Sequence, residues 1–254
     1  MIAGRRHFGT IGRVAGFAAA LAALLIGGPA PAQAPDYAAL IAAPDRSDAD
    51  READKRRDPL PLLKFTAARP GMKVLDMGAG GGYSTELMAR AVAPNGKVFG
   101  QYPPDSYPRA VETFQNRLKT PAMQDAAADV RPFDDPIAPD MHDLDLITFL
   151  FYYHDTTYLK VDRAAMDAKM FAALKPGGVL VIADHSAKPG ADISVGKTLH
   201  RIDEAVVRQE LEAAGFKLVA SGDFWRVPGD SRDFSSNKPP SPVDSFVLKF
   251  QKPQ

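Results

Sequence analysis

The feature that most constrains this chain is a glycine-rich segment, DMGAGGG at residues 76–82, which follows the apolar pair at 74–75. It places an acid, Asp76, before glycines at every second position, namely Gly78, Gly80 and Gly82. Residues 83–93 then have the apolar spacing of an amphipathic helix. Glycine lets the backbone turn sharply and approach a ligand closely where a strand passes into a helix. The segment therefore predicts the ligand-binding edge of an open α/β sheet.

Strand and helix patterns alternate along the rest of the chain. Residues 144–151, LDLITFLF, form an apolar run typical of a strand buried on both faces. The last two strands have no clear helix between them. We therefore expect a seven-stranded, mostly parallel sheet with one antiparallel strand and helices on both faces. The predicted strands are 74–75, 97–99, 129–132, 144–151, 179–183, 216–220 and 245–250, and the predicted helices are 60–68, 83–93, 107–119, 163–174 and 204–214. Residues 187–197 and 227–243 are predicted to be loops.

Residues 1–32 have the composition of a secretory signal. They contain no acid, three arginines and an apolar run at 14–28 that is shorter than the roughly 20 residues needed to span a bilayer. The run ends in small residues that permit cleavage after Ala32, and Arg5-Arg6 resembles the twin-arginine export signature. We expect the periplasm as location, with no stable membrane anchor after cleavage. The alternatives are an uncleaved anchor and a misassigned start codon.

The segment after the predicted signal is polar. Residues 45–58, DRSDADREADKRRD, mix both signs of charge, as in a solvated helix face with ion pairs four residues apart. We interpret residues 33–58 as a polar helical arm and residues 59–254 as the main domain.

Composition excludes several functions. Lys and Arg together number 31 and so do Asp and Glu, so the chain lacks the basic excess of a nucleic-acid-binding protein. The sequence contains 0 cysteines, which excludes disulfides, cysteine-ligated zinc, iron–sulfur clusters and thiol nucleophiles. We expect a small-molecule partner and no nucleic acid, and the sequence does not indicate an oligomeric state.

The motifs resemble those of class I S-adenosylmethionine-dependent methyltransferases. The resemblance rests on the acid with its G-x-G-x-G pattern, on LKPGG at 174–178 before the fifth strand, and on the fourth-strand motif at 145–149. More narrowly, PGMKVLD at 70–76, HRID at 200–203 and AGFKL at 214–218 resemble a family of exported bacterial proteins described as predicted methyltransferases. The resemblance to methyltransferases implies a Rossmann-like methyltransferase fold for residues 59–254.

The resemblance also implies S-adenosylmethionine as the cofactor. The backbone at Gly78, Gly80 and Gly82 would face its methionine part, and Asp76 would meet the ammonium group directly or through water. An NAD-dependent oxidoreductase is excluded, because its G-x-G-x-x-G pattern needs a third glycine where Tyr83 stands.

Two further cofactor contacts follow from the resemblance. Gln101 stands about 20 residues after the glycines, where the family normally has an acid that binds both ribose hydroxyls. A glutamine has one carbonyl acceptor and no charge, which weakens that contact, and Asp105 is an alternative acid. Asp134 is predicted near the adenine amine, or else as a turn cap beside Pro136.

Histidines follow two of the predicted strands and are the candidate catalytic bases. His154 follows the fourth strand and His185 the fifth, at the edge where parallel strands place ligands. Arg201 could bind an anionic substrate, although pairing with Asp203 is the preferred interpretation. We predict no metal site, because no His-x-x-x-His or similar ligand spacing occurs.

Two hypotheses follow. The first is an S-adenosylmethionine-dependent methyltransferase that acts on an unidentified small molecule. Methylation of amino groups in nucleic-acid bases is disfavoured, because residues 149–152 lack the Asn-Pro-Pro-Tyr type of motif. The alternative is a catalytically inactive periplasmic binding or structural protein that retains this fold. Gln101 and the export signal favour the alternative, since the cofactor is made in the cytoplasm, whereas the intact glycine segment favours the enzyme.

Overall fold

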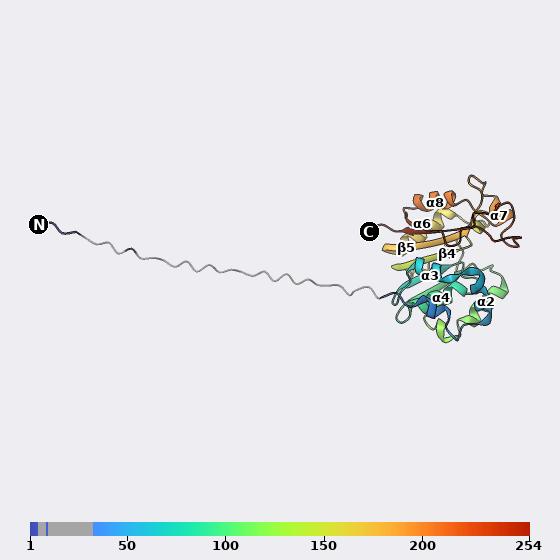
Figure 1. The fold of residues 1–254 in the computed structure, drawn as a ribbon, viewed down its shortest axis with the longest axis horizontal. Helices are drawn as coiled ribbons and strands as arrows, with labels where there is room; N and C mark the ends of the chain where they lie inside the picture. The colour runs from blue at the N-terminus through green and yellow to red at the C-terminus, as the bar shows by residue number, and fades with distance from the viewer. Residues whose placement is uncertain (5–8, 10–32) are drawn as a thin grey trace. The chain divides into compact units, whose positions relative to one another are not determined.

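Seven strands form a single sheet in the order β3-β2-β1-β4-β5-β7-β6 (Figure 1). Every neighbouring pair is parallel except those of β7, which runs antiparallel to both β5 and β6. The predicted seven-stranded sheet with one antiparallel strand is therefore confirmed. The strands are β1 (Lys73–Met77), β2 (Lys97–Tyr102), β3 (Ala126–Val130), β4 (Leu144–Leu150), β5 (Leu174–His185), β6 (Lys217–Gly222) and β7 (Ser245–Gln251).

The structure, a computed structural model, describes residues 1–4, 9 and 33–254. The signal predicted at residues 1–32 thus lies almost wholly outside the described residues. No helix within the described ranges is long and apolar enough to cross a membrane. The helices are α1 (Tyr37–Ile41), α2 (Asp48–Arg57), α3 (Pro59–Thr66), α4 (Tyr83–Val92), α5 (Pro108–Arg117), α6 (Arg163–Ala173), α7 (Val195–Leu199) and α8 (Glu204–Ala213), with short 3₁₀ turns at Pro121–Met123 and His154–Thr157.

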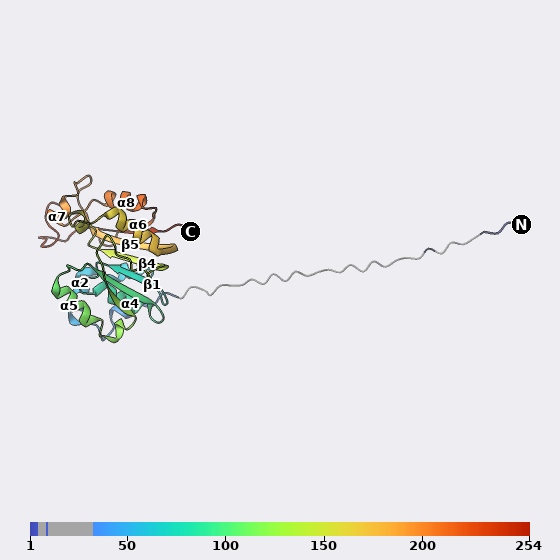
Figure 2. The same cartoon turned by 180° about the vertical axis from the view of Figure 1, so that it is seen from behind.

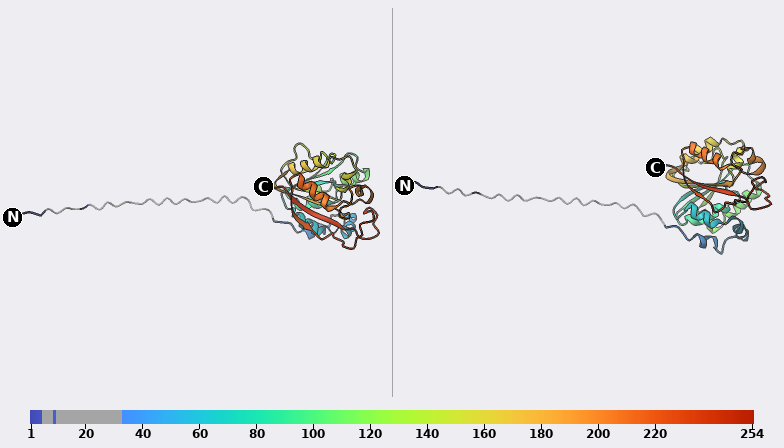
Figure 3. Two further views of the ribbon diagram at one scale, coloured as in Figure 1. Left: turned by 90° about the horizontal axis from the view of Figure 1, so that it is seen from above. Right: turned by 45° about the horizontal axis from the view of Figure 1, so that its top comes forward.

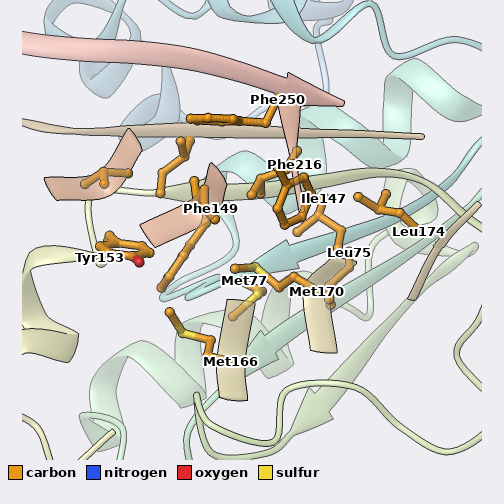
Figure 4. Close-up of a cluster of buried hydrophobic side chains, with 14 of the residues drawn as sticks. Leu75, Met77, Ile147, Phe149, Tyr153, Met166, Met170, Leu174, Phe216 and Phe250 are labelled. Atoms are coloured by element: carbon orange, nitrogen blue, oxygen red, sulfur yellow. The ribbon is translucent and has the colours of Figure 1, made fainter. Parts of the chain in front are cut away.

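Helices cover both faces of the sheet. Successive strand residues point to opposite sides, so apolar side chains lie on both faces and are buried by helices. On one face, Leu75 of β1 packs in a cluster with Met166 and Met170 of α6 (Figure 4). On the other, Val74 packs in a cluster that contains Leu87 of α4. Views from opposite sides show α6 and α8 on one side of β4 and β5, and α2 and α4 on the other (Figures 1 and 2). Helix α8 contacts β6, one of the two C-terminal strands (Figure 3).

Short sequence patterns predict where most helices and strands begin and end. Asp162 caps α6 by accepting a hydrogen bond from the Ala165 N–H at 3.0 Å, at the start of the predicted helix 163–174. The third strand begins three residues before the predicted range, because pairing with β2 recruits three alanines that carry no strand signal of their own. Residues 227–243 form no helix or strand, whereas α7 forms at the end of the predicted loop 187–197.

The polar segment at 33–58 forms helices, as predicted, but its charges do more than face solvent. Besides pairs along α2, its acids form ion pairs with other helices. Arg117 of α5 pairs with Asp50 at 2.7 Å, and Arg90 of α4 pairs with Asp45 at 3.0 Å. Asp50 is buried, so this segment is anchored by ion pairs on the helices that flank the glycine segment. Sequence spacing within one helix could not indicate these partners.

Candidate functional site

The glycine-rich segment makes the turn from β1 into α4 with a backbone that favours glycine. Gly78, Gly80 and Gly82 have φ angles of 65°, 54° and 81°, in the left-handed region. A methyl group on Gly78 would lie 2.7 Å from the Tyr152 ring, and one on Gly82 would clash with Phe114. The predicted glycines therefore form a tight turn at the carboxyl edge of β1, in which Ala79 is the one residue with a side chain. Residues 78–82 are hereafter the glycine cradle.

Asp76 lies beneath the glycine cradle and binds three hydroxyl groups. Thr148 of β4 donates to one carboxylate oxygen at 2.7 Å, and Thr85 and Ser84 of α4 donate to the other at 2.7 and 2.8 Å. Asp76 is only 1% exposed. Burial raises the pKa of its carboxyl group, and the three hydrogen bonds oppose that rise. Asp76 thus ties β1 to β4 and α4, while its contact with a cofactor ammonium group stays a prediction.

Gln101 supports the glycine cradle from the neighbouring strand. Its side-chain oxygen accepts the Gly78 N–H at 3.0 Å, and its amide nitrogen donates to the Arg131 carbonyl oxygen at 2.6 Å. The side chain is fully buried, so both ends of the amide are held by the protein. Gln101 therefore fixes the first glycine against the end of β3, and ribose binding by this residue stays a prediction.

The remaining predicted cofactor residue lies in the loop after β3. Asp134 is half-buried there, and its backbone oxygen accepts a hydrogen bond from Lys169 at 3.0 Å. Its neighbour Asp135 forms the ion pairs of this loop, with Arg131 at 3.0 Å and Lys169 at 2.8 Å. Asp105, the alternative acid, is exposed after β2. The adenine and ribose contacts of these acids stay predictions.

An aromatic side chain forms one wall of the glycine cradle. Phe151 follows β4 with a φ of 62°, and the chain turns there so that Tyr152 lies against Gly78. The next residue, Tyr153, points the other way into the core and donates toward Asp167 and Glu210. The two adjacent tyrosines therefore have different roles, Tyr152 as a wall of the cradle and Tyr153 as part of the core.

His154 is held at the carboxyl edge of the sheet by two carboxylates. Its Nδ1 lies 2.7 Å from an Asp184 oxygen, and its backbone N–H donates to the other Asp184 oxygen at 2.8 Å. Its Nε2 lies 3.1 Å from Asp155 Oδ1. Burial lowers the pKa of His154, but the two carboxylates outweigh burial and raise it to about 10. Both ring nitrogens are therefore engaged within the protein.

His185 is half-buried at the end of β5, between polar and aromatic neighbours. Its Nδ1 is 3.0 Å from the Ser245 hydroxyl, and its ring lies 4.7 Å from the Phe151 ring, which also faces Trp225 at 5.4 Å. Burial lowers the pKa of His185 to about 4, so its ring is neutral at pH 7. The two predicted bases lie at the same edge, with ring centroids 6.3 Å apart.

The structure adds residues to this edge that sequence reasoning did not assign. His200 follows α7, and its Nδ1 lies 3.6 Å from Asp155 Oδ1. Tyr158 donates a hydrogen bond to the same oxygen. Asp155 and Asp184 each stand next to a predicted histidine, and this repeated Asp–His adjacency after neighbouring strands was the available signal. The sequence contains three histidines with aspartates nearby, but their spacing does not indicate that His200 lies beside Asp155.

One predicted pairing is wrong. Arg201 pairs with Asp230 at 2.8 Å, not with Asp203, and both side chains are fully buried. Asp203 instead caps α8 by accepting the Ala205 N–H. The partner of Arg201 comes from the long loop at 227–243, a segment whose path no local pattern predicts.

Comparison with known proteins agrees with this geometry. The methyltransferase domain family matches residues 68–219, more than half of the chain. The ubiquinone/menaquinone biosynthesis C-methyltransferase UbiE of Shewanella halifaxensis is 33% identical over 137 residues, which are 52% of this chain and 49% of that protein. The chain thus spans about half the length of the curated relatives it matches.

Solved structures share the fold at low sequence identity. A S-adenosylmethionine-dependent methyltransferase from Aquifex aeolicus has a TM-score of 0.57 and 18% identity, covering 81% of this chain and 99% of that one. An arsenic(III) S-adenosylmethionine methyltransferase from Chlamydomonas reinhardtii has a TM-score of 0.59 and 16% identity, covering 88% and 75%. The strand order, the glycine cradle and these matches lead to one conclusion: the chain belongs to the methyltransferase domain family.

Proposed function

We propose that this chain is an S-adenosylmethionine-dependent methyltransferase that acts on a small molecule. The observation that carries the proposal is the glycine cradle at the carboxyl edge of β1, backed by Asp76 and its three hydroxyl partners. Ligands of open α/β sheets bind at this edge. Membership of the methyltransferase domain family supports methyl transfer as the reaction, and the methyltransferases among the structural relatives support the cofactor.

The residues present fit the methionine part of such a cofactor. Three left-handed glycines keep most of the cradle free of side chains, and a Cβ at Gly80 would lie 3.6 Å from the Tyr152 hydroxyl and 4.0 Å from the Gly78 backbone oxygen. When bound, S-adenosylmethionine supplies an electrophilic methyl group on a sulfonium centre. Gly78, Gly80 and Gly82 would hold its methionine part, with Tyr152 as the adjoining wall.

Of the two predicted bases, His185 is the better candidate to accept a proton from the methyl acceptor. His154 has both ring nitrogens against carboxylates, whereas His185 uses Nδ1 on Ser245 and is neutral at pH 7. Nε2 of His185 would accept the proton that the acceptor atom releases when it takes up the methyl group supplied by the cofactor. His154 would instead keep the ends of β4 and β5 in place.

The surroundings of His185 favour a planar, largely apolar acceptor. The Phe151 ring lies 4.7 Å from the His185 ring and 5.4 Å from the Trp225 ring, so the three form one aromatic cluster. Flat rings pack on such clusters in offset or tilted arrangements. The role of the UbiE relatives in ubiquinone and menaquinone biosynthesis, given by their name, is consistent with an acceptor of this shape.

Calorimetric titration of S-adenosylhomocysteine into residues 33–254 tests the cofactor site. We expect micromolar binding that Gly80→Ala weakens by about tenfold or more, equivalent to about 1.4 kcal/mol. Gly190→Ala is the matched control, because Gly190 also has a positive φ and open space around it but lies outside the cradle. Absence of binding by the unaltered protein would refute the proposal and favour the inactive alternative.

We also propose that the protein works in the periplasm. Support comes from the leader alone, with its arginine pair, short apolar run and small residues before position 33. Fractionation of the native host, with the mature N-terminus sequenced, tests this location. Protein found only in the cytoplasm with an intact leader would contradict it.

A further inference from the structure

The carboxyl edge of the sheet holds a second cluster, formed by His154, Asp155 and His200. Asp155 Oδ1 lies 3.1 Å from His154 Nε2 and 3.6 Å from His200 Nδ1, and the three ligand atoms all lie within 4.8 Å of one another. Two donors bound to one ion at about 2.1 Å lie roughly 3.0–3.5 Å apart in octahedral or tetrahedral geometry. Across the described ranges this is the one group of three such side chains with this spacing.

A carboxylate behind His154 fixes the direction of its ring. Asp184 Oδ1 lies 2.7 Å from Nδ1, which leaves Nε2 facing Asp155 and His200. His154 is 4% exposed and Asp184 fully buried, so neither side chain is free to turn away. Metal-binding histidines are commonly oriented by such a carboxylate on the other ring nitrogen. This arrangement does not depend on the glycine cradle.

Close packing of α7 brings His200, the third residue of the cluster, next to the other two. Gly196 of α7 has no room for a side chain, because a Cβ there would clash with Thr157 and with the backbone oxygen of His154. The helix therefore lies directly against the turn that carries His154 and Asp155. His200, the residue that ends α7, is held by a hydrogen bond from the Ser236 hydroxyl to its backbone oxygen at 2.7 Å.

We propose that His154, Asp155 and His200 bind one divalent first-row transition-metal ion. Two imidazoles and one carboxylate suit Zn²⁺, Co²⁺ or Fe²⁺, whereas Mg²⁺ and Ca²⁺ prefer oxygen ligands alone. Tyr158 donates to Asp155 and so helps to hold the carboxylate in place. The sequence predicts no metal site because its ligands are not closely spaced along the chain; packing of α7 brings His200 to residues more than 40 positions earlier.

The test is calorimetric titration of Zn²⁺ into the full, untagged chain after removal of metal with a chelator. No methyl donor is present, so the result is independent of the proposed function. We expect one Zn²⁺ per chain, and Co²⁺ should bind competitively with a visible absorption spectrum of the bound ion. The competing account is an ion-pair cluster in which a protonated His154 lies between two carboxylates, and it predicts no stoichiometric binding.

Matched variants locate the ion. His200→Ala should abolish binding, and Asp184→Asn should weaken it by about 10- to 100-fold through loss of ring orientation. His142→Ala is the control, because His142 also pairs with an adjacent aspartate, Asp143 at 2.8 Å, but is exposed. Thermal unfolding checks that each variant is folded, and His200→Asn replaces His200→Ala if the alanine variant is not. Absence of Zn²⁺ binding by the unaltered chain, or binding that survives substitution of His200, would overturn the proposal.

Discussion

The buried carboxyl group of Asp167 on α6 makes the stability of this protein depend on pH. The Tyr153 hydroxyl lies 2.9 Å from Asp167 Oδ2 and 2.7 Å from Glu210 Oε2, but it has one proton to donate. Glu210 also pairs with Arg163 at 2.6 Å. Asp167 is 1% exposed, and its Oδ1 has no hydrogen-bond partner among the described residues. Burial, with the Glu210 charge adding to it, raises the pKa of Asp167 to about 7.

The direction in which stability changes with pH follows from proton linkage. The folded protein binds the Asp167 proton more tightly than the unfolded chain, whose aspartates have a pKa of about 3.9. The free energy of unfolding therefore falls as pH rises from about 4 to about 7 and is unaffected by this group above that range. A difference of about 3 pKa units at about 1.4 kcal/mol per unit gives about 4 kcal/mol lost across the window.

Asp167→Asn tests this reasoning, because asparagine resembles the neutral acid at every pH. We expect the variant to match the unaltered protein near pH 4 and to exceed its stability by up to about 4 kcal/mol at pH 8. Urea unfolding at several pH values, read by circular dichroism, measures the difference, and Asp105→Asn at an exposed site is the control. A stability difference between variant and parent that stays constant with pH would refute the assignment.

Three further predictions concern other buried groups and the leader. Thr148→Val should lower the free energy of unfolding by about 1–3 kcal/mol, because it leaves a buried oxygen of Asp76 without its donor; urea unfolding measures this, and an unchanged midpoint would contradict it. Arg201→Met should cost about 3–5 kcal/mol by leaving the Asp230 charge buried without its partner, whereas Arg208→Met on exposed α8 surface should cost little in the same assay. Secreted protein should begin after Ala32, which N-terminal sequencing checks; a retained leader would count against cleavage.

Local patterns account for much of the fold. The apolar run at 144–151 became β4, Asp162 capped α6, and Gly78, Gly80 and Gly82 made the sharp turn that their glycine content indicates. These features could be predicted because side-chain periodicity and backbone freedom are properties of a few consecutive residues. The start of β3 could not, since alanines become a strand there only by pairing with β2.

The residues of the site also include some that could be predicted from the sequence and some that could not. The glycine cradle and the positions of His154 and His185 after neighbouring strands could be predicted from local patterns, because parallel strands bring their carboxyl ends to one edge. The contact of His200 with Asp155, and the pairing of Arg201 with Asp230 rather than Asp203, depend on long-range packing. Those contacts join segments about 30 to 45 residues apart, so they depend on how α7 and the loop at 227–243 pack against the sheet. A contact between distant segments is set by the path of the whole chain, which no local spacing encodes.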